Sequence, residues 1–134
     1  MATKDYAELD EDDYYGQDFE QKGFVSVWLG LTDDSDDEEN LDVLQDLCGV
    51  GCYDLDWQEG NCFEFELVPV KRLLEELSFA SSFIDQALLA AKAKGMEQAR
   101  WVLVQFDFAY DPARVKRPIA ADPVFLGVFP YVRD

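Results

Sequence analysis

The segment FVSVWLG, residues 24–30, constrains the fold more than any other part of the chain. Alternating residues of a strand point to opposite faces, so Trp28 lies on one face while Val27 and Leu29 lie on the other. Apolar side chains on both faces are typical of an inner strand. The chain is therefore predicted to build a sheet around this segment.

Three further strands are predicted from their hydrophobic patterns. FEFELV, residues 63–68, alternates between apolar and acidic side chains, as a half-buried strand does. The segments 101–110 and 124–132 are rich in β-branched and aromatic residues. We expect these last two strands to pair antiparallel through the Pro-containing loop between them.

Three helices are predicted from apolar stripes at helical spacing. The first runs from Ser35 to about residue 48, the second follows Pro69, and the third follows Ser82 and ends at Gly95. Ser35 and Ser82 each precede an acid by three residues, the spacing of a capping box. The chain is thus predicted to be α+β, with about four mostly antiparallel strands and two or three helices packed on one face.

Negative charge is concentrated in the first half of the chain. Residues 1–66 hold 21 Asp and Glu against two Lys, a charge of −19, whereas residues 67–134 hold 8 acids and 9 Lys plus Arg, a charge of +1, which together give the net −18. This sign disfavours nucleic acid and anionic membranes as ligands, because both are bound through Lys and Arg. The acids form either a solvated face or a surface that attracts a basic protein.

The length of 134 residues suits one domain. Residues 1–22 are predicted to be an acidic, mobile leader, and residues 23–134 a single domain. The chain has no apolar run of the roughly 20 residues that cross a bilayer, and its first residues lack the apolar stretch of a secretory signal. Its three cysteines suit a reducing compartment, so we expect a cytoplasmic protein.

No pattern in the chain indicates catalysis, a metal or a cofactor. The sequence contains no histidine, which removes the usual base for a serine or cysteine nucleophile. A calcium loop starting at Asp33 would need glycine at its sixth position, where the chain has Glu38. Carboxylate pairs are expected by chance among 29 acids, so a small carboxylate-dependent hydrolase is the weakest hypothesis.

Acids interleaved with aromatic side chains are the candidate partner-binding residues, since aromatic residues dominate the energetics of many interfaces. They occur in the leader, in an acidic loop and in the middle of the chain. The candidates are Tyr14, Tyr15, Asp33, Asp34, Asp36, Asp37, Glu38, Glu39, Asp54, Asp56, Trp57 and Glu59. The alternatives are that the leader is a solubilising tail and that Trp57 is an ordinary core aromatic.

FVSVWLG, CYDLDWQE and VQFDFAY with FLGVFPYV together resemble the immunity protein 22 family of bacterial polymorphic toxin systems. The resemblance covers roughly residues 23–132, and its most specific element is the strand that carries Trp28. Membership implies an α+β fold, no catalysis, and the binding and blocking of a cognate toxin. The family does not fix which residues contact the toxin.

The sequence and the resemblance together predict an immunity protein. We expect it to neutralise a toxin with a basic C-terminal domain, a nuclease by the charge argument, by occluding the active cleft with an acidic surface. The alternative is an acidic adaptor or interaction domain without a toxin partner.

Overall fold

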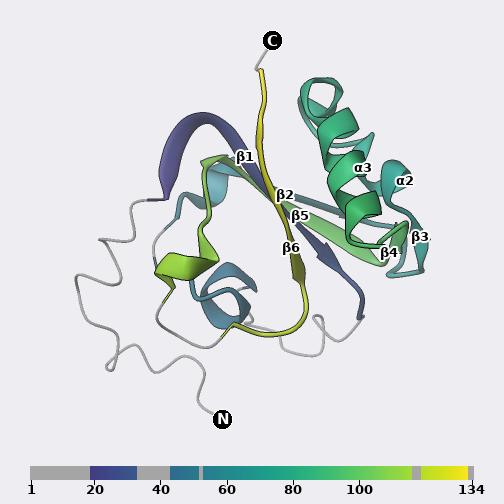
Figure 1. Ribbon diagram of the computed structural model, residues 1–134, viewed down its shortest axis with the longest axis horizontal. Helices are drawn as coiled ribbons and strands as arrows, with labels where there is room; N and C mark the ends of the chain where they lie inside the picture. Colours follow the sequence, from purple (N-terminus) through teal and green to yellow (C-terminus); the bar gives the residue numbers. More distant parts are fainter. Residues whose placement is uncertain (1–18, 33–42, 52, 116–118, 133–134) are drawn as a thin grey trace.

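The strand β1 (Glu20–Gly30) is the centre of the fold, as its two apolar faces predicted. It pairs antiparallel with β5 (Trp101–Phe108) on one side and with β6 (Val124–Pro130) on the other. β2 (Gln58–Cys62) adds antiparallel beside β5, so the sheet order is β2-β5-β1-β6 (Figure 1). The computed structural model describes the following residues: 19–32, 43–51, 53–115 and 119–132.

The last two strands do not pair with each other, and that prediction was wrong. β1 lies between β5 and β6. A direct antiparallel neighbour is enforced only by a short hairpin turn. Here residues 109–123 separate the two strands, and this length lets the chain pass the end of β1.

Two helices cover one face of the sheet, which confirms the α+β class. α2 (Val70–Leu74) and α3 (Ile84–Ala93) lie together on one side of the sheet in Figure 1. A second, two-stranded sheet of β3 (Val68–Pro69) and β4 (Gln98–Ala99) flanks them. Against these elements pack the side chains of β1 that point to this face: Val25, Val27 and Leu29, all fully buried.

The sequence predicted a start signal for α3 at Ser82 and a stop signal at Gly95, and the structure tests both. Gly95 has φ +73°, the left-handed conformation of a residue just past a helix, and so confirms the predicted stop. The capping box at Ser82 was wrong. Its hydroxyl donates to the Phe79 carbonyl at 2.8 Å and accepts from the Val132 amide at 3.0 Å, so it ties the helix region to the end of β6 instead.

An aromatic cluster covers the opposite face of the sheet. Tyr110 lies at its centre, with its ring centroid 5.1 Å from that of Trp28 and 4.8 Å from that of Phe125. Its hydroxyl donates to the Cys48 carbonyl at 2.6 Å, and burial, reinforced by Cys48 and Asp111, raises the pKa of this hydroxyl. Both faces of the sheet therefore carry a packed core.

The helix predicted from Ser35 to about residue 48 is described only at its end. That end is a π-helical turn, η3 (Val43–Leu47), which places Leu44 in the aromatic cluster. The capping box at Ser35 lies outside the described residues.

The first described residues belong to the fold. Phe19 is 3% exposed, its ring packs edge-on against Phe108 and at a tilt against Tyr110, and β1 begins at Glu20. The described domain thus starts before the predicted boundary at residues 22 and 23. No helix among the described ranges combines the length and the apolar character needed to cross a bilayer.

The strand predicted at residues 63–68 was wrong for most of its length. The Glu66 amide donates to the Phe63 carbonyl at 3.0 Å, and Glu64 and Phe65 between them have φ of 56° and 58°. Two left-handed central residues define a type I′ turn. Only Val68 and the residue after it form a strand, β3. The alternating sequence cannot distinguish this turn from a strand, because contacts with distant residues determine the conformation of the turn.

Two arginines supply those contacts. The Arg100 guanidinium donates to the Phe65 carbonyl at 3.0 Å, and that of Arg72 lies 4.4 Å from the centre of the Phe63 ring. A hydrogen bond from a charged donor and a cation–π contact each contribute on the order of 1 kcal/mol, which offsets part of the cost of the left-handed residues.

Candidate functional site

The predicted partner-binding residues fall into described and undescribed groups. Tyr14 and Tyr15 in the leader lie outside the described residues. So do the residues of the acidic loop: Asp33, Asp34, Asp36, Asp37, Glu38 and Glu39. The structure describes the third group, formed by Asp54, Asp56, Trp57 and Glu59.

Residues 54–57, here called the Trp57 turn, form a single 3-10 turn before β2. The Asp54 side chain accepts a hydrogen bond from the Asp56 amide at 3.0 Å, and the Asp54 carbonyl accepts one from the Trp57 amide at 3.0 Å. Asp favours such positions because its short carboxylate reaches the backbone two residues on. The turn is therefore closed by its own first residue.

A buried glutamine holds the Trp57 turn from beneath. Gln105 on β5 is 1% exposed, and its side-chain nitrogen donates to the Asp54 carbonyl at 2.7 Å. The Gln58 side chain donates to the Gln105 side-chain oxygen at 3.4 Å. A buried amide needs such partners, since an unsatisfied polar group in a core costs about 1–3 kcal/mol. The pairing fixes the position of the turn on the sheet before any partner arrives.

The Trp57 turn presents apolar side chains to solvent. Leu55 is 66% exposed and Trp57 is 36% exposed, so Trp57 is not the core aromatic of the alternative hypothesis. Asp54 and Asp56, which flank Leu55, are also exposed. An exposed apolar pair of this kind, rimmed by charge, is typical of a protein-binding surface.

Glu59 does not share the surface of the Trp57 turn. Gln58 lies opposite Gln105 in the sheet, so the next residue along β2 points to the other face. There the Glu59 carboxylate accepts a hydrogen bond from the Ser78 amide at 3.0 Å, just beyond α2. The sequence grouped Glu59 with Asp54 and Asp56, but the structure gives it a role in holding the helices.

A hollow of about 430 Å³ lies beside β2, on the same face of the sheet as the Trp57 turn. Leu103 is two residues from Gln105 on β5 and therefore points to that face, directly opposite Gly60 of β2. Because Gly60 has no side chain, the β2 residue directly opposite Leu103 does not cover it. A Cβ added to Gly60 would lie 3.6 Å from Leu103 Cδ1.

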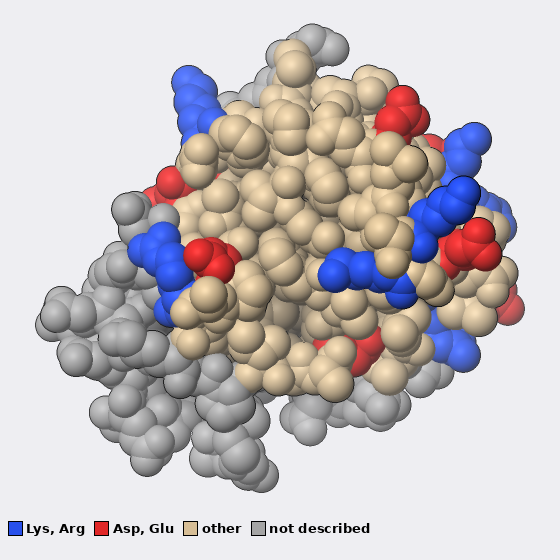
Figure 2. Space-filling model, in the orientation of Figure 1, with Lys and Arg blue, Asp and Glu red and all other residues tan. Residues whose placement is uncertain are grey.

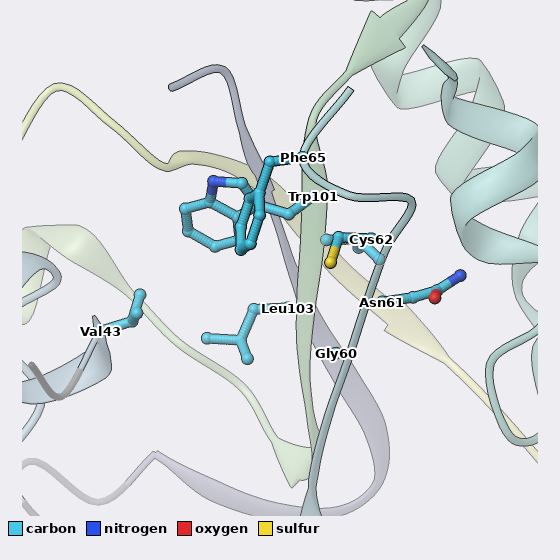
Figure 3. Close-up of a pocket in the computed structure, with 8 residues that line it drawn as sticks. Val43, Gly60, Asn61, Cys62, Phe65, Trp101 and Leu103 are labelled. Carbon is cyan, nitrogen blue, oxygen red and sulfur yellow. The ribbon is translucent and has the colours of Figure 1, made fainter. Parts of the chain in front are cut away.

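Apolar side chains line most of this hollow. Figure 3 shows the Phe65 ring beside the Trp101 indole, Leu103 below them, and Val43 of η3 across the gap. The Cys62 sulfur lies near its upper part, whereas the Asn61 side chain points away toward the helices and donates to the Leu73 carbonyl at 3.1 Å. Sequence reasoning missed this site, because its walls come from separate segments of the chain. A strand at residues 58–62 was not predicted, and only within such a strand would Gly60 have been a signal.

Charge differs sharply between the site and the helices. Residues 54–66 hold five acids and no Lys or Arg, whereas residues 67–100 hold five Lys and Arg and four acids. In Figure 2 several Lys and Arg side chains gather where α2 and α3 lie, with Asp and Glu among them. A positive partner is therefore attracted to the part of the surface that carries the Trp57 turn.

Within the described ranges, no group of three Cys, Asp or Glu side chains is placed to hold a metal ion. Ser26, a buried hydroxyl, donates to the Phe108 carbonyl at 2.7 Å and accepts from the Tyr110 amide at 3.0 Å, so it is engaged in joining β1 to the end of β5. What the site offers chemically is shape, apolar surface and negative charge.

Comparisons with known proteins add no relative. No family model matches the chain, and neither a curated protein nor a solved structure matches it.

Proposed function

We propose that this protein is an immunity protein that binds a cognate bacterial toxin and neutralises it. The observation that carries the proposal is the Trp57 turn, where Leu55 and Trp57 are displayed beside the two exposed carboxylates of Asp54 and Asp56. The fixed position of this turn reduces the ordering cost that a flexible loop would add to binding. The resemblance of the sequence to toxin-neutralising proteins supplies the class of partner.

The proposed mechanism is occlusion of the toxin's active cleft. A nuclease binds its substrate through Lys and Arg that contact phosphates. The carboxylates at positions 54 and 56 would take the place of phosphates, and Trp57 would supply apolar contact that the substrate lacks. The high negative charge of the chain would speed the encounter with a basic domain, toward about 10⁸–10⁹ M⁻¹s⁻¹ at low salt.

The test is rescue of growth. Immunity genes sit beside toxin genes, so we would express the basic C-terminal domain encoded by the neighbouring gene, in the cytoplasm, with and without this chain. We expect growth arrest from that domain alone, relief when this protein is co-expressed, and a one-to-one complex by size-exclusion chromatography.

Two results would count against the proposal. A neighbouring protein that arrests growth equally in the presence of this chain would exclude it as the cognate toxin. A one-to-one complex with a protein that causes no arrest would favour the acidic adaptor.

A further inference from the structure

We propose that the hollow beside β2 seats one large apolar side chain of the partner, on a segment whose neighbouring residues are Lys or Arg. This inference deepens the proposed function, on which its biological meaning rests, because it names the chemistry that the toxin brings to this surface.

The hollow fits an apolar side chain by size and lining. A cavity of about 150 Å³ lined by Leu, Ile and Phe holds a benzene ring. The hollow here has about 430 Å³ and is bordered by Phe65, Trp101 and Leu103. Its residues include no Lys, Arg, Asp or Glu, so nothing in the lining recognises a charged group. The hollow is open to solvent and has room for the side chain of a partner's leucine or phenylalanine.

One wall of the hollow is built at a conformational cost. Phe65 has φ 58°, a left-handed conformation that is strained for an aromatic residue. The Arg100 hydrogen bond to the Phe65 carbonyl holds the residue there, and its ring lies beside Trp101 (Figure 3). The strained turn thus forms the wall before a partner binds, which is a form of preorganisation.

The rim selects positive charge around the apolar side chain. Glu64 and Glu66, which flank the lining residue Phe65, are exposed, and so are Asp54 and Asp56 of the Trp57 turn. The two cations that contact the turn at residues 63–66 are Arg72 and Arg100, and the four acids Asp54, Asp56, Glu64 and Glu66 outnumber them. An uncharged apolar ligand gains nothing from this rim, whereas Lys or Arg on either side of an apolar residue complements it.

The hollow and the Trp57 turn lie within reach of a single partner segment. Strands rise about 3.3 Å per residue, so Gly60 lies roughly 10 Å along β2 from Trp57. Gln58 and Gly60 point to the same face of the sheet, since they pair with Gln105 and Leu103, and the Gln105 side chain holds the turn on that face through the Asp54 carbonyl. An extended segment of about four residues spans that distance.

Peptide binding tests the inference on the full chain without the toxin. The probe is a five-residue peptide with leucine between two pairs of lysines, blocked at both ends. We expect saturable changes in the amide NMR signals of Gly60, Cys62 and Leu103. Replacing the leucine with serine should weaken binding at least tenfold, because the buried apolar contact is lost. Replacing the lysines with glutamates should abolish saturation.

Blocking the hollow at Cys62 provides the matched control. In a Cys52→Ser background, N-ethylmaleimide should react at the partly exposed Cys62, since Cys48 is buried. The adduct fills the hollow, and we expect it to weaken binding of the leucine peptide at least tenfold. The Cys62→Ser variant in the same Cys52→Ser background, treated with the same reagent, should bind the peptide as the untreated protein does. Dispersed amide spectra of the adduct and of this variant confirm that both proteins remain folded.

Three outcomes would overturn the inference: no saturation with the leucine peptide, equal binding of the glutamate peptide, or signal changes that the adduct leaves unaltered. Each of these outcomes can be distinguished from a failure of the growth test. Rescue without peptide binding keeps the immunity proposal and removes the hollow from it. Peptide binding without rescue would support the hollow as a site for basic peptides and would contradict the proposal that the partner is a toxin.

Discussion

Substitution of single residues can show whether an exposed apolar side chain matters because it lies in the Trp57 turn or merely because it is exposed. Leu55 on the turn and Leu89 on α3 are exposed to a similar extent, 66% and 69%. They therefore form a matched pair for substitution, one within the proposed interface and one on the helix side. Trp57, being larger and partly packed, serves as the anchor of the same surface.

We predict that Leu55→Ala and Trp57→Ala speed dissociation from the toxin domain that passes the growth test. The expected increase is about tenfold or more for Trp57, since truncating a central aromatic commonly costs about 2 kcal/mol. The association rate should change little, because no charge is altered. Surface plasmon resonance measures both rates.

Leu89→Ala is the control for that experiment and should leave both rates unchanged. If all three variants dissociate at the rate of the original protein, with unchanged melting temperatures, the interface lies elsewhere on the molecule.

At this scale the sequence indicated some residues and misassigned others. Asp54, Asp56 and Trp57 could be chosen because acids and aromatics alternate there, and the structure brings all three into one turn. Glu59 belongs to the same run of letters but faces the opposite side of the sheet. Gln105 could not be chosen, because its contact with Asp54 joins residues 51 positions apart.

Secondary-structure elements were predictable where a local signal decides them. β1 and β5 were expected from their apolar content, and the end of α3 from Gly95. The turn at residues 63–66 was not predictable, because its sequence alternates as a strand does and its conformation depends on distant arginines. The placement of β6 also escaped prediction, since a long loop leaves the order of strands open.

At the scale of α3, we predict that Gly95→Ala lowers the free energy of unfolding by about 1 kcal/mol. No atom lies within 4 Å of the added Cβ, so the cost comes from the positive φ alone. Gly95→Asn should cost clearly less, because Asn tolerates the left-handed conformation. Urea denaturation of the three proteins measures the difference. Equal stability of the Ala and Asn variants would show that φ at residue 95 does not set the cost.

At the scale of the whole molecule, charge acts against the fold. A net charge of −18 on 134 residues favours expansion through self-repulsion. The resemblance and the acidic composition pointed to a binding protein, but neither located the hollow, whose walls are assembled only by the fold.

We therefore predict that NaCl stabilises the protein. Raising its concentration from about 0.01 M to 0.1 M shortens the screening length from about 30 Å to about 10 Å. The free energy of unfolding should rise by an amount on the order of 1 kcal/mol, as repulsion among acids weakens. Urea titrations at a series of salt concentrations measure this effect.

The shape of that salt series distinguishes screening from other salt effects. Screening should produce most of its gain below about 0.2 M, whereas stabilisation by ion exclusion continues to rise at higher concentrations. A free energy of unfolding that does not change below 0.2 M NaCl would mean that repulsion among the acids does not destabilise the folded state.

The strand order has a consequence for biosynthesis. β1 is made first, but its two neighbours span residues 101–108 and 124–130, so neither is available until most of the chain has been translated. At about 5–20 residues per second, the ribosome takes roughly 5–20 s to travel from the first strand to the last. Throughout that interval the central strand of the sheet has no edge to join, and its apolar part, residues 24–29, is the segment that a nascent-chain chaperone would have to shield.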